Sequence, residues 1–269
     1  MNFKNLLSKI LLISILSFTF SFAYQSTNPY VQYIPKDNHK IIKLKYAFID
    51  YYDCNEKKPD FIVETLEKWM MLKKHYSRKG IPFRPDYNLP KQCRAYPKDM
   101  GKKFGVDHGH NAPNYDWSWN KKYQKQTFLM SNITAQVSSF NRYLWKDIEG
   151  FTRYLTMKYN KTYIYTGSFG FKSYVKNKVI MPKYFYKLIL VPETKDAYLF
   201  VCENKKYKRK KYTYTEIQKY LIDLKTFNKM SKDFNLELKE KWNFKMEIKK
   251  QSFLKKGVKF VFNILKNFH

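Results

Sequence analysis

The chain of 269 residues has little cysteine, little acid and few long apolar runs. Its three cysteines allow at most one intramolecular disulfide, and their spacing matches no zinc-binding motif. Only 22 acidic residues stand against 52 lysines and arginines, which gives a formal net charge of +30. AT-rich codon usage would enrich Lys, but it would enrich Glu and Asp as well. The excess of basic over acidic residues therefore indicates a polyanionic partner. Nucleic acid and an anionic membrane surface both fit that charge.

One stretch alone has the character of a targeting segment. Residues 10–22 are mostly apolar, follow Lys4 and Lys9, and lead to Ala23. A basic start, a short apolar core and small residues at the end are typical of a secretory signal peptide over residues 1–23. The alternative is an uncleaved anchor, because the run lies near the lower length limit for a span. Cleavage would leave no integral membrane span and would place the protein in the periplasm or outside the cell, where cysteines meet an oxidising compartment.

The remaining chain is expected to comprise a polar lead (24–43), one domain (44–240) and a basic extension (241–269). Aromatic and β-branched residues predict strands, at 46–52, 59–63 (the hairpin partner of 46–52), 104–107, 127–133, 162–166, 184–191 and 198–202. Four prolines between residues 73 and 103 exclude a long helix there.

Two amphipathic helices are expected from apolar spacing of three and four residues. The first covers residues 140–159, with Ser138 or Ser139 as its N-cap. The second covers residues 253–268, where apolar residues alternate with lysines. That helix either docks its apolar stripe on the domain or lies on an anionic membrane. Between them, Thr213 and Glu216 predict a capping box at the start of a shorter helix.

The most reactive segment is Asp-His-Gly-His-Asn-Ala-Pro at residues 107–113. An imidazole takes up a proton near neutral pH, so a histidine here is a candidate general base. Gly109, between the two histidines, lets the backbone come close to a ligand. Zinc binding by His108 and His110 is the alternative, because their i, i+2 spacing puts both on one face of a strand.

The predicted helix 140–159 carries polar groups in a row. Asn141, Glu149 and Arg153 are spaced by multiples of four residues, and each four-residue step advances about 40° around the helix axis. Mg²⁺ prefers oxygen ligands and retains several waters, so an amide oxygen and a carboxylate suffice to hold it. A solvated helix face with a Glu149–Arg153 ion pair is the alternative for this row alone.

Taken together, three motifs resemble the DNA/RNA non-specific endonuclease family, the ββα-metal (His-Me finger) nucleases related to mitochondrial endonuclease G. They are Asp-His-Gly-His at residues 107–110, Thr-Phe-x-x-Ser-Asn with Gln136 at residues 127–136, and Asn-x3-Trp-x3-Glu at residues 141–149. Shorter matches occur upstream at Arg78 and residues 83–86, and downstream at residues 165–167 and 179–183. The likeness covers about residues 57–235. It implies an α+β fold in which helices flank a central antiparallel sheet and a ββα finger holds the site.

The resemblance also implies roles for individual residues. His110 would be the general base, and Asn141 the direct ligand of Mg²⁺, for which Mn²⁺ would be a substitute. Glu149 would orient metal-bound waters, while Arg78 and Arg153 would steady the phosphate in the transition state. His108 is a further catalytic position, and Arg84, close to Arg78, is a substrate-binding candidate. Lys121 and Lys122 are candidates for contacts to backbone phosphate because of their charge, with solvated loop charge as the alternative.

Two positions depart from the family pattern, in which His108 is an arginine and Ala135 is a proline. Because a histidine is charged only below its pKa, we expect cleavage that is weaker or favours acidic pH. The sequon Asn132-Ile133-Thr134 is interpreted as part of the family strand rather than as a glycosylation site.

The sequence therefore predicts an exported, Mg²⁺-dependent endonuclease that cuts DNA and RNA with little sequence preference. The main alternative is a catalytically weakened protein of the same fold that binds nucleic acid at the cell surface. A cationic membrane-active protein is the third hypothesis.

Overall fold

A computed structural model describes residues 31–35, 40–44, 47–231 and 234–248. Its centre is a seven-stranded sheet in the order β11-β9-β8-β7-β4-β3-β2, in which only β11 and β9 pair in parallel. These strands are β2 (Lys40–Leu44), β3 (Ile49–Asp53), β4 (Lys58–Glu67), β7 (Lys161–Tyr174), β8 (Ile180–Val191), β9 (Asp196–Glu203) and β11 (Asn243–Phe244). Two further antiparallel pairs join β1 (Val31–Pro35) to β10 (Phe234–Leu238) and β5 (Val106–His110) to β6 (Ile133–Val137).

Helices are few and mostly short. The α-helices are α2 (Lys68–Leu72), α3 (Asn114–Trp117), α4 (Lys121–Thr127), α5 (Lys146–Tyr159), α6 (Tyr214–Ile217) and α7 (Leu224–Met230). Single 3₁₀ turns are η1 (Lys91–Cys93), η2 (Pro97–Asp99), η3 (Lys102–Phe104), η4 (Met130–Asn132) and η6 (Gln218–Tyr220), whereas η5 (Phe140–Trp145) is a π-helix.

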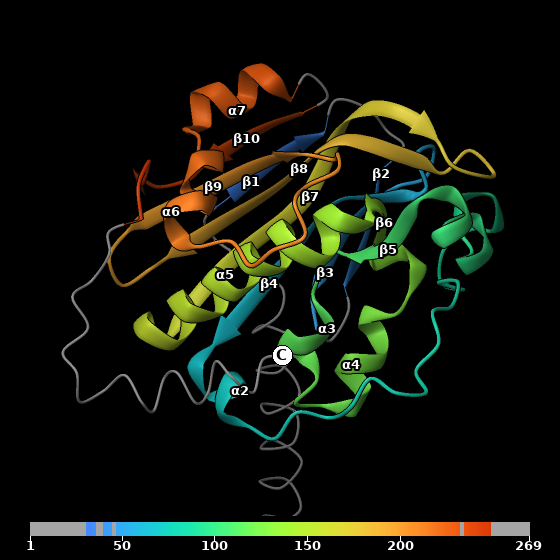
Figure 1. Cartoon of the computed structure of the whole chain (residues 1–269), viewed down its shortest axis with the longest axis horizontal. Helices are drawn as coiled ribbons and strands as arrows, with labels where there is room; N and C mark the ends of the chain where they lie inside the picture. The colour runs from blue at the N-terminus through green and yellow to red at the C-terminus, as the bar shows by residue number, and fades with distance from the viewer. Residues whose placement is uncertain (1–30, 36–39, 45–46, 232–233, 249–269) are drawn as a thin grey trace, which may run out of the picture.

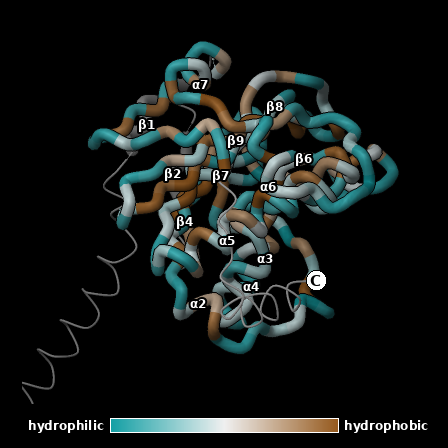
Figure 2. The backbone as a smooth tube through the Cα atoms, turned by 60° about the vertical axis from the view of Figure 1, so that its left-hand side comes forward, coloured by the Kyte–Doolittle hydropathy of each residue, from teal (hydrophilic) through white to brown (hydrophobic). Residues whose placement is uncertain are grey.

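Successive side chains of each strand point to opposite faces of the central sheet, and an apolar core lies on each face. Ile62 and Ile164 belong to the core under α5, with Ile148 and Phe151 from that helix. Their neighbours along the strands lie in a second core, which includes Phe227 of α7 and Leu236 of β10. In Figure 1, α5 crosses one face of the sheet, and in Figure 2 the hydrophobic stretches of the tube run through the central strands. This α+β arrangement is the predicted fold class, and it gives α5 a rigid support.

Most of the predicted strands are confirmed. β3 and β4 form the expected hairpin, and β7, β8 and β9 contain the three strands predicted downstream. The segment between Lys73 and Lys103 has only 3₁₀ turns, as its prolines require. The lead 24–43 contributes β1 and most of β2, which extends the edge of the central sheet.

The strand predicted at residues 127–133 is wrong. Thr127 ends α4, a 3₁₀ turn follows at Met130–Asn132, and the strand begins at Ile133. The buried Asn132 side chain explains the turn, because its amide donates to the carbonyls of Ala112 and Thr127 and accepts from the backbone N–H of Ala112. Those bonds satisfy backbone groups that a strand ladder would otherwise have to pair. The sequon residues Asn132 and Thr134 are buried, as their interpretation as part of the family motif requires.

The predicted N-cap position is confirmed at Ser139, which precedes η5, but its side chain makes no capping hydrogen bond. Ser139 has helical dihedral angles, and its hydroxyl accepts a hydrogen bond from the Tyr207 backbone N–H. Ser138 donates its hydroxyl proton to Asp107. Both serines therefore connect the helix start to neighbouring segments. The capping box of Thr213 and Glu216 is confirmed, although the α-helix that it begins is only four residues long.

One disulfide joins Cys54 to Cys93, and the third cysteine, Cys202, is buried with a free thiol. Within the described ranges, no helix has the length and apolar character needed to cross a membrane. The expected signal peptide (1–23) and C-terminal helix (253–268) lie outside the described residues.

Candidate active site

The candidate site lies on β5, β6 and the helix that follows them, a ββα unit. β5 pairs antiparallel with β6, in a register that places His110 opposite Ile133. Gly109 is required by close packing, since a Cβ at this position would lie 2.3 Å from Oε1 of Gln136. Any larger residue would force β5 and the buried Gln136 side chain apart. The glycine between the two histidines thus sets how closely the strand carrying them approaches β6.

His110 lies at the end of β5 in an aromatic setting. Its ring centroid lies 5.4 Å from that of Phe83. It lies 5.2 Å from the centroid of Phe128, and these two rings meet edge-on. Nε2 is buried and makes no hydrogen bond in the described part of the chain. Burial, the Arg78 guanidinium and His108 together lower the pKa of His110 to about 3. The imidazole is therefore neutral near pH 7 and has a lone pair available for a proton.

Arg78 approaches the same aromatic ring. Its guanidinium carbon lies 5.2 Å from the centroid of Phe128, and the side chain is exposed to solvent. Phe128 thus contacts both Arg78 and His110. The structure brings this predicted arginine to the candidate base, although 32 positions of sequence separate them.

His108 occupies a more structural environment than His110. Its Nε2 lies 2.9 Å from the carbonyl oxygen of Pro97, which can only accept, so this nitrogen carries the proton. The ring also stacks on Phe83 at 4.6 Å between centroids and 18° between planes. Among the described residues, no group of three potential metal ligands includes His108 or His110. The structure therefore gives no support to the zinc alternative.

Asp107 ties β5 to the start of the helix. Its carboxylate accepts hydrogen bonds from the Ser138 hydroxyl at 2.9 Å, from Asn141 Nδ2 at 3.1 Å, and from Arg142 Nε and an Arg142 terminal nitrogen at 2.7 and 2.6 Å. Burial raises the pKa of Asp107, but these bonds outweigh it and hold the pKa below its usual value. The carboxylate is thus a fixed anionic acceptor.

The Asn141 side chain has its orientation set by this bond. Because Nδ2 donates to Asp107, the amide oxygen is directed elsewhere and is available as a hard ligand for a cation. Asn141 belongs to the π-helix η5, and such turns often occur at functional sites. Two turns further along the helix lies the half-buried Glu149. Burial raises the pKa of its carboxyl to about 7, against the opposing charges of Arg153 and Lys187.

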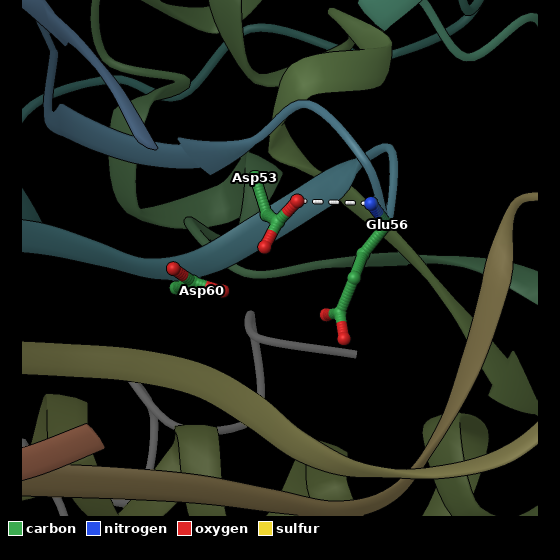
Figure 3. Close-up of side chains that lie close together, drawn as sticks. All are labelled: Asp53, Glu56 and Asp60. Atoms are coloured by element: carbon green, nitrogen blue, oxygen red, sulfur yellow. Dashed lines mark hydrogen bonds between the residues drawn. The ribbon is translucent and has the colours of Figure 1, made fainter. Parts of the chain in front are cut away.

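The Asn141 amide oxygen and the Glu149 carboxylate are the kind of oxygen donors that suit Mg²⁺, which binds oxygen and keeps its waters. The second carboxylate-rich cluster of the molecule is a poorer candidate. Asp53, Glu56 and Asp60 have oxygens within 4.8 Å of one another (Figure 3). However, the buried Lys58 ammonium lies 2.5 Å from Glu56 and 3.6 Å from Asp60, where it already offsets part of the negative charge of this cluster.

Arg153 is buried and donates to Asp116 at 2.9 Å. It therefore lies in a network of buried charges behind Glu149 rather than in an exposed row. Glu64 and Lys187, also buried, complete the network, since both influence each other's pKa and Lys187 acts on Glu149. Sequence reasoning missed Glu64, Asp116 and Lys187. The one available signal was a lysine within the apolar strand at residues 184–191.

The remaining predicted residues lie at the periphery. Arg84 is half-buried, and its backbone exchanges hydrogen bonds with Phe128 and Met130. Lys121 and Lys122 are exposed at the start of α4, and the Lys121 ammonium lies 4.9 Å from the ring centroid of Tyr76.

A family model for the DNA/RNA non-specific endonucleases matches residues 26–242. The chain belongs to this family. Among its relatives, nuclease C1 of Cunninghamella echinulata var. echinulata is 33% identical over 136 residues, covering 46% of this chain and 54% of that protein. Human mitochondrial endonuclease G is 29% identical over 163 residues, covering 56% of this chain and 54% of that protein. The chain thus spans about half the length of these curated relatives.

A solved structure, "Crystal structure of the EndoG/EndoGI complex: Mechanism of EndoG inhibition", has a chain with the same fold. The TM-score is 0.63 at 24% identity, over 73% of this chain and 84% of that chain. This similarity confirms the predicted ββα-metal fold class.

Proposed function

We propose that the protein is a metal-dependent endonuclease that hydrolyses phosphodiester bonds of DNA and RNA with little sequence preference. The observation that carries the proposal is the ββα unit, which joins a neutral His110 on β5 to an oriented Asn141 amide on the helix through Asp107. Membership of the nuclease family supports the reaction class. The formal net charge of +30 supports a polyanionic substrate, because phosphate contacts are electrostatic and independent of sequence.

Asn141 would hold Mg²⁺ directly and Glu149 would hold it through water. When bound, the ion supplies Lewis acidity and neutralises the charge of the leaving oxygen. The other steps fall to the chain itself. His110 takes a proton from the attacking water, and Asp107 keeps the Asn141 amide in place. Arg78, which lies exposed beside Phe128, would contact the phosphate. Arg153 is engaged by Asp116, which favours a positioning role for this arginine through Glu149.

Export is part of the proposal. A basic start, the apolar run at residues 10–22 and Ala23 are typical of a signal peptide. The Cys54–Cys93 disulfide supports this destination, because disulfides persist in oxidising compartments such as the periplasm or the extracellular space.

The test is cleavage of plasmid DNA and of RNA by purified protein, with Mg²⁺, Mn²⁺ or a chelator, beside His110→Ala and Asn141→Ala. We expect cutting that stops in chelator and returns with metal, and a loss of about 10²–10⁴-fold in His110→Ala. Absence of metal-dependent cutting by the unaltered protein would overturn the proposal. If that protein still bound DNA in a salt-sensitive manner, the nucleic-acid-binding alternative would replace it.

A further inference from the structure

A second surface of the molecule combines exposed aromatic rings with lysines. We call it the α2 surface and define it by Trp69, Lys73, Tyr76, Trp119 and Lys121. Trp69 is 42% exposed and Tyr76 is 39% exposed. Tryptophan and tyrosine are enriched at contact surfaces, because each combines a large apolar ring with a polar group.

The rings are held in place by specific contacts. The indole nitrogen of Trp69 donates to Glu67 at 2.5 Å, and its ring meets Trp119 edge-on at 4.9 Å between centroids. The Lys73 ammonium lies 4.8 Å from the Trp69 centroid and 5.2 Å from that of Trp119. The Lys121 ammonium is likewise 4.9 Å from Tyr76. Each exposed ring thus carries a cation beside it.

A hollow adjoins Trp69. It is a shallow, open depression with a volume of about 400 Å³, and it is lined by Glu67, Lys68, Trp69, Leu72, Asn160 and Lys161. Its one acidic residue, Glu67, forms an ion pair with Lys161 at 2.7 Å. The balance of charge at the hollow and the α2 surface is therefore positive, with Lys68 and Lys73 both exposed.

Two connections of the chain lead from the α2 surface toward the candidate active site. Lys68 bonds through its backbone to Asn160, at the end of α5, and Glu149 lies eleven residues earlier in the chain, roughly 16 Å along the axis. The segment from Lys73 leads in five residues to Arg78 at Phe128. In Figure 1, α2, α3 and α4 lie together beside α5. A substrate strand that extends from the candidate active site along α5 would therefore run toward the α2 surface.

We propose that the α2 surface binds an unpaired stretch of the substrate strand, with bases stacked on Trp69 and Tyr76 and phosphates beside Lys73 and Lys121. The inference rests on the proposed nuclease function and adds a preference for single-stranded substrate next to the cleaved bond. Unpaired bases expose their faces to aromatic side chains, whereas paired bases are stacked inside a duplex. Interleaved aromatics and lysines are the combination that binds single strands without reading sequence.

The test measures affinity for a single-stranded 12-mer and for the matching duplex, in chelator so that nothing is cut. Base stacking contributes about 1–3 kcal/mol per base, so we expect Trp69→Ala to weaken single-strand binding roughly 5- to 150-fold and duplex binding far less. Trp69→Phe should recover part of the loss. The control is Tyr174→Ala, which removes an aromatic residue that is 60% exposed on β7 and should change neither affinity.

Equal losses for both nucleic acids, or no loss for either, would overturn the inference. An anionic membrane is the competing occupant, so binding to phosphatidylglycerol vesicles is measured with the same variants. Loss of vesicle binding in Trp69→Ala with unchanged single-strand affinity would also overturn it. Failure of the nuclease proposal is distinguishable, because that failure appears as absence of metal-dependent cutting by the unaltered protein.

Discussion

At the scale of single residues, His110 owes its neutrality to its surroundings. Phe83 and Phe128 exclude water from the ring, and Arg78 and His108 oppose a second positive charge there. The imidazole is therefore unprotonated at neutral pH, but a pKa this far below 7 by itself makes it a weak base. A bound phosphate would then favour the imidazolium that forms when water gives up its proton.

This environment predicts a stability cost in acid. The unfolded chain protonates His110 near pH 6.5, whereas the folded chain does so near pH 3. Between those values the unfolded state binds the extra proton, so the free energy of unfolding decreases as pH falls. The His110→Gln variant lacks this titrating group. Its free energy of unfolding should therefore fall less between pH 6.5 and pH 5 than that of the unaltered protein, by at most roughly 2 kcal/mol. Urea unfolding of both proteins at the two pH values measures it, and parallel losses would contradict the predicted pKa shift.

His108 stands where the family has arginine, and in this protein it is fixed by Pro97 and Phe83. An arginine would carry a permanent charge next to the site. We therefore expect His108→Arg to raise turnover near neutral pH. Steady-state cleavage of an oligonucleotide at pH 6 and pH 7.5 gives the comparison, with His108→Gln as the uncharged control. Unchanged or lower turnover at pH 7.5 would count against a rate penalty from histidine.

At the scale of secondary-structure elements, the junction of β5 with the π-helix η5 determines the orientation of the Asn141 amide, the proposed metal ligand. Asp107 accepts from Ser138, Asn141 and Arg142, so one carboxylate holds the first turn of the helix against the strand. The wider π turn places Asn141 where its amide reaches that carboxylate. Pattern analysis predicts a helix here, but not its π geometry, because that depends on the packing of the strand.

This junction predicts unequal effects for two neighbouring substitutions. Asp107→Ala removes the acceptor that orients Asn141, and losing such a partner typically costs 10–100-fold in activity or metal affinity. Arg142→Ala removes an ion pair whose arginine is 52% exposed but keeps the Asn141–Asp107 bond, so its loss should be only a fewfold. Titrating Mg²⁺ against the cleavage rate of both variants provides the test. Equal losses would show that the carboxylate acts through Arg142 instead.

At the scale of the whole molecule, the central sheet carries α5 on one face and α7 with β10 on the other. The disulfide joins the β3–β4 turn to the 3₁₀ turn η1 over 39 positions of sequence. It thereby ties the loop region between α2 and β5, which has little regular structure, to the sheet.

The length of that loop predicts the contribution of the disulfide. Closing about 39 residues removes unfolded-state entropy equivalent to roughly 4 kcal/mol in the chain-entropy model, and measured values are typically about 2–4 kcal/mol. The double variant Cys54→Ser with Cys93→Ser should lose stability in that range. Urea unfolding without reductant measures it, and the unaltered protein in reductant is the matched control. Equal stability of the oxidised protein and the double variant would contradict the prediction.

The sequence by itself determined the family, the α+β class and the order of the main strands along the chain. It also identified His110, Asn141 and Glu149 as candidate site residues, because all of these depend on local patterns and short motifs. It did not determine the turn at Asn132 or the role of Ser138 and Ser139, since side-chain bonds to distant segments override local propensity there. The pairing of Cys54 with Cys93, the engagement of Arg153 by Asp116 and the gathering of Trp69, Trp119 and Lys73 on one surface likewise depend on residues far apart in sequence. Only the folded arrangement brings such residues together, and burial then sets their charge.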